Sequence, residues 1–295
     1  MGDQSLPREV RHVAEDALGR RIVRFEPVSA GLTQALTGIA TLDDGTRGFI
    51  KAALDEHAHS QVATEIRNLR SLRASFLPRV LGASVDPPTL ILEDLSAGHW
   101  PEPYPDDLDG LEGALEELRS LPIPRDLELR RIRPPGERIL SRLKADARTA
   151  VGPAAPWVER HAAQIRDAVG SLGDGNALVH SDLWYSNICF LPDRVVLVDW
   201  SDLSIGSPWF DAASVSIDLV IEGRRPLIHA EAAGWAAAHT AWMIWSLARG
   251  PGPAIADPEA WIKDDRELFD GAAWWLAHEL GVDPPPRLTT RIVGW

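Results

Sequence analysis

Three polar side chains, His180, Asp182 and Asn187, stand between two apolar runs at a spacing that can support phosphoryl transfer. The segment from Leu178 to Trp200 reads LVHSDLWYSNICFLPDRVVLVDW. Transfer to a hydroxyl needs a carboxylate that orients the hydroxyl and takes its proton, which Asp182 can supply. It also needs oxygen ligands for Mg²⁺, which Asn187 can supply. An ordinary loop could contain the same residue types, because Asp and Asn are common in turns.

Asp199 ends the next apolar run and is the second candidate magnesium ligand. We expect short buried strands at Ala177–Val179 and Val195–Val198 around the loop. A two-stranded hairpin would bring Asn187 and Asp199 to the same end, because each borders the paired apolar segments. This combination favours a catalytic site over an ordinary loop.

The elements before this loop are predicted to be mainly strands. Strands at 35–42 and 47–54 flank Asp43-Asp44-Gly45, which is a hairpin turn signal. A helix is predicted over 56–73 from apolar residues at helical spacing, and a further apolar strand over Thr89–Leu92.

The second part of the chain is predicted to be mostly helical, with an embedded hairpin. A segment rich in Pro and acidic residues, 98–109, suggests a boundary before it. We therefore expect an α+β chain with a nucleotide-binding lobe at 1–95 and a catalytic, acceptor-binding lobe at 96–295.

The composition excludes several classes of protein. A formal net charge of -13 argues against a nucleic-acid partner, which would require a basic surface. A single cysteine, Cys189, excludes an intramolecular disulfide and a thiolate metal cluster. The chain has no apolar stretch of about 20 residues and no signal-peptide pattern at its start, so we expect a cytoplasmic protein without a membrane partner.

Together these motifs resemble the catalytic and metal-binding loops of the aminoglycoside phosphotransferase and choline kinase family, which is related to protein kinases. Asp199-Trp200 resembles the family's shortened metal-binding motif, and the run GSPWFDAA at 206–213 resembles its downstream pattern. The resemblance covers roughly residues 29–213. It implies a two-lobed kinase-like fold, ATP and Mg²⁺ as cofactors, and a hydroxyl of a small molecule as the acceptor.

The resemblance also implies supporting roles. Asp211 would hold the backbone of the catalytic loop, and His180 would support the segment around Asp199. Two positions depart from the family pattern: Ser181 stands where the family commonly has Gly, and Ser207 where it often has Asp. These departures leave the subfamily open.

By the same resemblance, a lysine on a strand should pair with a glutamate on the next helix. Lys51 lies in the predicted strand, and Glu65 lies on the apolar stripe of the helix, where a carboxylate is costly without a partner. The pair would hold the α- and β-phosphates of ATP. The remaining nucleotide contacts implied are a phosphate-covering turn with Ser29, Gly31 and Thr33, and the main chains of Glu93 and Leu95 at the adenine.

The acceptor pocket of this family lies in the C-terminal lobe. Carboxylates there would pair with amines, and aromatic faces would meet a cation or a sugar. The candidates near the catalytic loop are Trp184, Asp202, Trp209 and Glu222. The acidic residues from 264 to 270 are interpreted as a solvated helix face, and the tryptophans at 235, 242 and 245 as core.

We therefore expect an ATP-dependent phosphotransferase, with an antibiotic such as an aminoglycoside as the leading acceptor. Choline, an amino-acid alcohol, an amino sugar, a ketosamine, or a nucleoside or peptide antibiotic remain alternatives, and the run His-Ser-Asp-Leu-Trp is similar to ketosamine kinases. A non-catalytic pseudokinase would be expected to lack one of Lys51, Asp182, Asn187 or Asp199, and all four are present. A protein kinase would carry an activation segment ending in Ala-Pro-Glu, which the sequence lacks. The oligomeric state is open.

Overall fold

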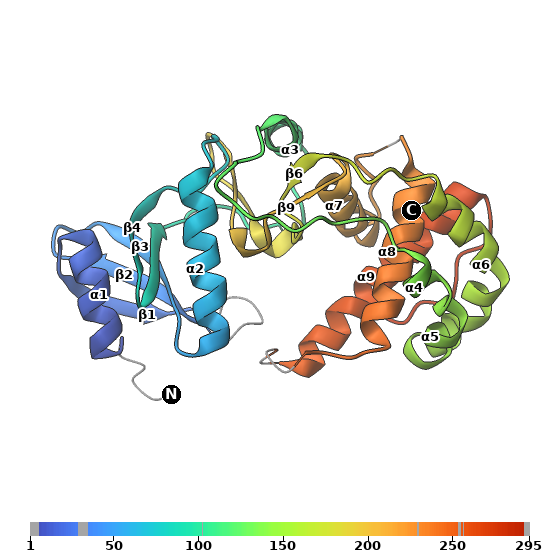
Figure 1. Ribbon diagram of the computed structural model, residues 1–295, viewed down its shortest axis with the longest axis horizontal. Helices are drawn as coiled ribbons and strands as arrows, with labels where there is room; N and C mark the ends of the chain where they lie inside the picture. The colour runs from blue at the N-terminus through green and yellow to red at the C-terminus, as the bar shows by residue number, and fades with distance from the viewer. Residues whose placement is uncertain are drawn as a thin grey trace.

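The computed structural model describes most of the chain, namely residues 6–28, 35–101, 103–228, 230–252, 255 and 257–291. A strand-rich N-terminal part lies at one end of an arch and a helical C-terminal part at the other (Figure 1). The shorter strands and α7 lie between them (Figure 1). The predicted α+β arrangement, with a strand-rich first part and a helix-rich second part, is confirmed.

Within the described residues, the N-terminal part contains an antiparallel five-stranded sheet in the order β1-β2-β3-β5-β4. Its strands are β1 (Ile22–Pro27), β2 (Leu36–Leu42), β3 (Arg47–Ala52), β4 (Val80–Val85) and β5 (Pro88–Glu93). The predicted turn joins β2 to β3, with Gly45 at a φ of 83° that favours glycine. The sequence did not predict β4, whose run VLGASV has no sustained apolar pattern.

Two helices accompany the sheet. Helix α1 (Arg8–Leu18) packs on β4 and β5, and α2 (Glu56–Ser71) packs on β5 and reaches the C-terminal part. The side chain of Asp55 caps α2 by accepting a hydrogen bond from the backbone N–H of Ala58 at 2.8 Å. The buried face of α2 carries Glu65 and Asn68 between apolar neighbours. Two polar groups on a buried stripe require partners. Asn68 finds its partner in the C-terminal part, and Glu65 finds one there and another in Lys51 on β3.

The C-terminal part is built around α7 (Phe210–Ile221), in which every residue is buried. The other helices of this part, within the described residues, are α3 (Asp109–Ser120), α4 (Glu137–Leu140), α5 (Leu143–Ala150), α6 (Ala155–Gly170), α8 (Ala232–Leu247) and α9 (Pro258–Leu280). Of these, α8 and α9 pack against α7. One apolar core runs from α2 and β5 into these helices. The boundary between residues 95 and 96 therefore stays a prediction, because packing is continuous across it.

Two short antiparallel pairs lie between the sheet and the helices. β7 (Ile188–Phe190) pairs with β8 (Val195–Leu197), and β6 (Ala177–Val179) pairs with β9 (Ser204–Gly206). Both predicted strands exist. The hairpin is formed by β7 and β8, and β6 has a different partner, because pairing over such short runs depends on the surrounding core and not on the runs themselves.

The interpretation of the acidic residues on α9 as solvated is wrong for three of them, Asp265, Glu267 and Asp270, which are buried. Asp270 accepts hydrogen bonds from the backbone N–H groups of Leu288 and Thr289 at 2.9 and 2.8 Å. The chain after α9 returns to Asp270 and to Glu267, which pairs with Arg291 at 3.0 Å, whereas Asp265 is hydrogen-bonded to Ser246 of α8. A helical pattern cannot reveal a segment that returns from later in the sequence.

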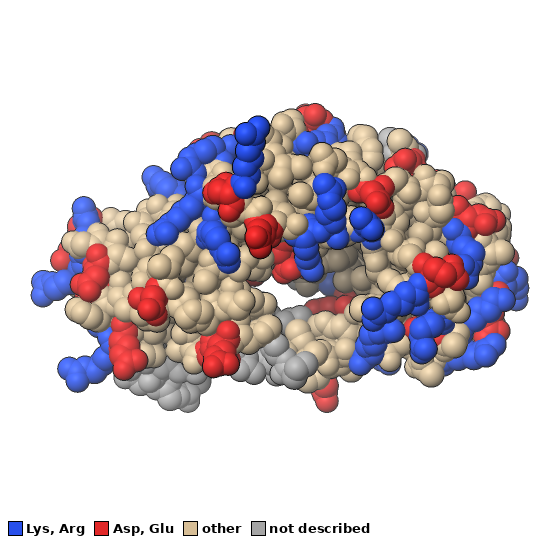
Figure 2. Space-filling view, viewed as in Figure 1, with Lys and Arg blue, Asp and Glu red and all other residues tan. Residues whose placement is uncertain are grey.

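The face drawn in Figure 2 carries basic and acidic residues intermixed, and the molecule is hollowed between the two ends of the arch. This face has no continuous basic surface of the kind that nucleic-acid binding requires. None of the helices in the described part of the chain is long and apolar enough to cross a membrane.

Candidate active site

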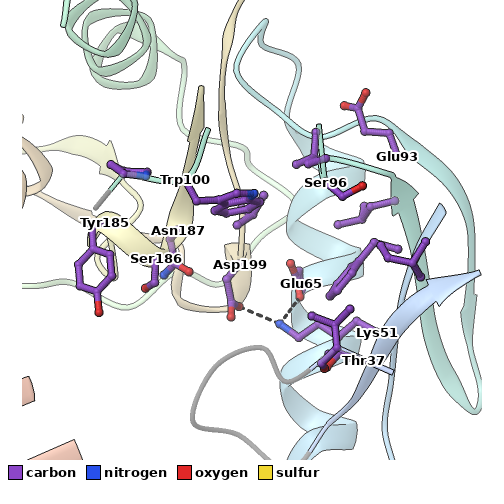
Figure 3. A pocket seen from close by; sticks show the side chains of 17 residues that line it. Thr37, Lys51, Glu65, Glu93, Ser96, Trp100, Tyr185, Ser186, Asn187 and Asp199 are labelled. Carbon is purple, nitrogen blue, oxygen red and sulfur yellow. Dashed lines mark hydrogen bonds and ion pairs between the residues drawn. The ribbon is translucent and has the colours of Figure 1, made fainter. Parts of the chain in front are cut away.

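A buried lysine links the two parts of the molecule. The Nζ of Lys51, on β3, lies 2.8 Å from Oε2 of Glu65 on α2 and 3.0 Å from Oδ1 of Asp199 (Figure 3). Burial alone would lower the pKa of Lys51, but the two carboxylates outweigh this effect and raise it. Burial would likewise raise the pKa of Asp199, and Lys51 outweighs it and lowers it. Both groups are therefore charged near neutral pH.

The backbone of Trp200 fixes Asp199 beside this lysine. Its N–H donates to Oε1 of Glu65 at 3.3 Å, and its carbonyl accepts from Nδ2 of Asn68 at 2.7 Å. The Trp200 ring is buried and stacks on Phe76 with centroids 5.7 Å apart. Sequence reasoning missed Asn68. The available signal was a second polar residue on the apolar stripe that carries Glu65.

Asp182 lies in the loop after β6, with both carboxylate oxygens near donors. Oδ1 accepts from Nε1 of Trp184 at 3.1 Å, and Oδ2 lies 3.4 Å from Nδ2 of Asn187. Burial raises the pKa of Asp182 to about 6, with further contributions from the charges of Asp199 and Asp202. Asp182 is thus mostly ionised at neutral pH and can accept a proton.

Asn187 and Asp199 lie together at one end of the β7–β8 hairpin. The backbone carbonyl of Asn187 accepts the N–H of Val198 at 3.0 Å, which extends the hairpin to Asp199. Nδ2 of Asn187 donates to the carbonyl of Asp182 at 2.7 Å, so the amide oxygen is left for another partner. A carboxylate and an amide oxygen fit a magnesium ion. Among the described residues no group of three or more His, Cys, Asp or Glu can hold a metal, so an ion here would share its coordination with phosphate oxygens and water.

The loop backbone is held from α7 and from β8. Asp211 accepts N–H groups from His180 and Ser181 at 2.8 and 2.9 Å, and Nε2 of His180 donates to the carbonyl of Val198 at 2.8 Å. Ser181 has a φ of 69°, in the region that favours glycine. Its hydroxyl donates to the carbonyl of Asp202 at 2.6 Å, which offsets part of that strain.

A cavity of about 490 Å³ lies between the sheet and the candidate catalytic loop (Figure 3). Lys51, Glu65, Asn187 and Asp199 stand at its polar side. Its apolar side is contributed by Val28, Ile39, Phe49, Leu92, Leu95, Trp100 and Val198. The cavity has the polar and apolar halves that a nucleotide requires.

The structure describes only some of the other predicted nucleotide contacts. Glu93 and Leu95 line the cavity, and the carboxylate of Glu93 is turned to Arg79 and Arg194. A contact through the main chain is compatible with that orientation. Ser29, Gly31 and Thr33 lie outside the described residues.

Two of the acceptor candidates adjoin Asp182. Trp184 donates to its carboxylate, as above. Asp202 lies close enough to raise its pKa and is paired with Arg130 at 2.8 Å. Trp184 lies on the loop after β6 and Asp202 follows β8, and both stay predicted acceptor contacts.

The other two candidates are engaged elsewhere in the fold. Trp209 lies under the guanidinium of Arg119, 4.6 Å from its ring centroid. Glu222 accepts the backbone N–H of Tyr104 at 3.0 Å. Neither role excludes a contact with an acceptor, and both remain predictions.

A family model described as "Phosphotransferase enzyme family" matches residues 7–245 of this chain. A comparison with curated proteins finds no significant match.

Solved structures of similar fold include a ternary complex of streptomycin, ATP and APH(2")-IIa, with 17% identity, a TM-score of 0.56 and coverage of 92% of this chain and 99% of that one. The choline kinase LicA from Streptococcus pneumoniae has 16% identity and a TM-score of 0.56, with coverage of 87% and 94%. A choline/ethanolamine kinase family protein from Mesorhizobium loti has 14% identity and a TM-score of 0.54, with coverage of 86% and 88%. At these identities the similarity establishes a shared kinase-like fold.

Proposed function

Since the chain belongs to the phosphotransferase enzyme family, we propose that it transfers the γ-phosphoryl group of ATP to a hydroxyl of a small molecule, with Mg²⁺ as cofactor. The observation that carries the proposal is the buried contact of Lys51 with both Glu65 and Asp199 at the edge of the cavity. An ammonium held at 2.8 and 3.0 Å between two carboxylates from different parts of the fold is positioned to bind phosphate oxygens.

Each polar group then has a role in an in-line transfer. Lys51 holds phosphate oxygens, and Glu65 keeps it in place. Asn187 and Asp199 would hold Mg²⁺, which when bound neutralises charge on the phosphates. Asp182 orients the acceptor hydroxyl and accepts its proton as the new O–P bond forms and ADP departs.

The leading acceptor class is an antibiotic of the aminoglycoside type. The net charge of -13 supports an amine-bearing acceptor, because an acidic protein concentrates cations near its surface. Choline, ketosamines, amino sugars, amino-acid alcohols, and nucleoside or peptide antibiotics are the alternatives. Use of ATP as the donor further favours a cytoplasmic protein.

A panel of such acceptors tests the proposal. Wild-type protein with Mg-ATP should release ADP faster in the presence of at least one acceptor, and mass spectrometry should find that acceptor heavier by one phosphoryl group. Asp182→Asn should abolish this release. Acceptor-dependent ADP release that survives this substitution at the wild-type rate would overturn the assignment of Asp182.

A further inference from the structure

The nucleotide cavity has an aromatic wall to which the proposed mechanism gives no role. Trp100 follows the segment that joins the two parts of the chain, and its side chain is among the exposed large apolar groups, at 39%. Its indole lines the cavity and reaches toward the sheet (Figure 3). Ile39, Phe49 and Leu92 line the same cavity from the sheet.

The backbone on both sides of Trp100 is fixed. His99 exchanges two hydrogen bonds with Phe190 of β7, each 2.8 Å long. Four residues after Trp100, the N–H of Tyr104 donates to both oxygens of Glu222 at 3.0 and 3.1 Å.

Further bonds tie the following residues to α7 and to the chain after it. The Tyr104 hydroxyl donates to Oδ2 of Asp218 at 3.1 Å, and the same oxygen accepts the N–H of Tyr185 at 2.8 Å. Arg224 donates to the carbonyl of Pro105 at 2.9 Å. Tyr185 itself lines the cavity, so one buried carboxylate fixes two segments of its wall. The backbone that carries the indole is thereby anchored at His99 and at Tyr104 before any ligand binds, which lowers the entropic cost of binding.

We propose that Trp100 is a nucleoside-binding residue whose indole packs against the base and ribose of the bound nucleotide. The proposal rests on the proposed function, because it takes the cavity to be the nucleotide site. An aromatic face opposite apolar residues of a sheet forms a slot for a planar heteroaromatic group. The polar groups that would hold phosphates, Lys51 and Asp199, line another side of the cavity. A partly exposed indole at such a position loses its unfavourable contact with water when the nucleoside covers it.

If Trp100 binds the nucleoside through its aromatic face, its loss should affect the affinity for different nucleotides in the same way. Every nucleobase has a π face, so stacking does not distinguish bases by their hydrogen-bonding groups. Loss of the indole should therefore weaken the binding of ADP and GDP by a similar factor. Trp100→Phe keeps an aromatic ring and should retain most of the affinity, whereas Trp100→Ala should lose it.

The experiment is calorimetric titration of the full-length protein with Mg-ADP and Mg-GDP. We expect Trp100→Ala to raise the Kd for both nucleotides about 10- to 50-fold, the size of a lost stacking contact. Trp100→Phe should stay within about threefold of wild type. Val85→Ala is the matched control, since Val85 is another exposed apolar residue and lies outside the cavity lining. Its Kd should equal that of wild type.

A second measurement keeps the test decisive if the alanine variant folds poorly. Mg-ADP should change the tryptophan fluorescence of the wild-type protein, and Trp100→Phe should lose most of that change while still binding ADP.

The outcomes separate the two hypotheses. A wild-type protein that binds no nucleotide overturns the proposed function and this inference with it. A wild-type protein that binds Mg-ADP, together with a Trp100→Ala variant of unchanged Kd, overturns the inference alone. An unchanged fluorescence response in Trp100→Phe does the same.

Discussion

Each carboxylate oxygen of Asp182 faces a different hydrogen-bond donor. This arrangement fits a general base, which must be ionised and still able to accept a proton. The indole of Trp184 and the amide of Asn187 stabilise the ionised form, while burial and the neighbouring acids raise the pKa to about 6. A base with a pKa just below neutral pH combines ionisation with the capacity to accept a proton.

We predict that Asp182→Asn lowers kcat by about 100- to 10,000-fold, which is the usual contribution of a positioned general base. The amide keeps the shape of the side chain but cannot accept the proton. Steady-state kinetics with the acceptor identified by the panel would measure the loss. Asp193→Asn makes the same change at an exposed position in the β7–β8 turn and should leave kcat unaltered. A loss of less than about tenfold in Asp182→Asn would contradict the role of a general base.

His239, on α8, is a buried polar residue within an aromatic cluster. The rings of Trp184, Phe210, Trp235 and Trp242 lie with centroids 5.2 to 6.4 Å from its own. Neither ring nitrogen has a hydrogen-bond partner among the described residues. Burial lowers the pKa of His239 to about 3, so the ring is neutral in the folded protein over most of the acidic range.

We predict that His239 makes the protein less stable in mild acid. Below its unfolded pKa of about 6.5, the unfolded chain binds a proton that the folded chain does not, so the free energy of unfolding falls as the pH drops toward about 3. Between about pH 7 and pH 5 the loss should be about 2 kcal/mol. Urea unfolding of wild type and His239→Leu at both pH values would measure it. Between these pH values the free energy of unfolding of His239→Leu should fall by about 2 kcal/mol less than that of wild type. Parallel pH profiles of the two proteins would show that His239 is protonated equally in the folded and unfolded states.

At the scale of elements, α2 connects the sheet to the segment that carries Asp199. Glu65 and Asn68 are three residues apart, and their side chains hold the backbone N–H and the backbone carbonyl of Trp200. Asp199 directly precedes Trp200, so the position of a candidate magnesium ligand depends on a helix of the other part of the molecule.

We predict that Asn68→Ala lowers the free energy of unfolding by about 1–3 kcal/mol, because it leaves the buried carbonyl of Trp200 without its donor. Chemical denaturation would measure the change. Arg67→Ala is the control, since Arg67 lies on the exposed side of the same helix and its substitution should have little effect. Equal stability of Asn68→Ala and wild type would mean that the carbonyl finds another partner.

The sequence predicted those parts of the site whose residues stand in a recognisable local pattern or motif. The stripe of α2 made Glu65 conspicuous, the family resemblance paired it with Lys51, and the two apolar runs predicted that Asn187 and Asp199 would meet. The features it missed depend on distant segments. The donor role of Asn68 depends on a peptide 132 residues away. Trp100 lines the cavity from a segment that is hydrogen-bonded to β7 and α7, and no pattern around residue 100 shows those attachments.

At the scale of the whole molecule, the cavity lies at the junction of the two parts. Its lining comes from β2, β3, α2 and β5 on one side and from Tyr185–Asn187 and the residues directly after β8 on the other. A ligand that contacts both sides adds links between them. Because it binds only the folded arrangement, it should stabilise the whole protein by mass action.

We predict that Mg-ATP raises the melting temperature and that Lys51→Ala loses this effect. At a nucleotide concentration of about 100 times Kd, the added stability should be about 2.7 kcal/mol, which corresponds to a rise of several degrees. Removal of magnesium with a chelator should reduce the rise, because Asn187 and Asp199 would then have no ion through which to bind the phosphates. Lys144→Ala, at an exposed position on α5, should respond to Mg-ATP like the wild type. A full thermal shift in Lys51→Ala would mean that the nucleotide is held without the lysine, and the phosphate-binding role of Lys51 with Glu65 and Asp199 would have to be abandoned.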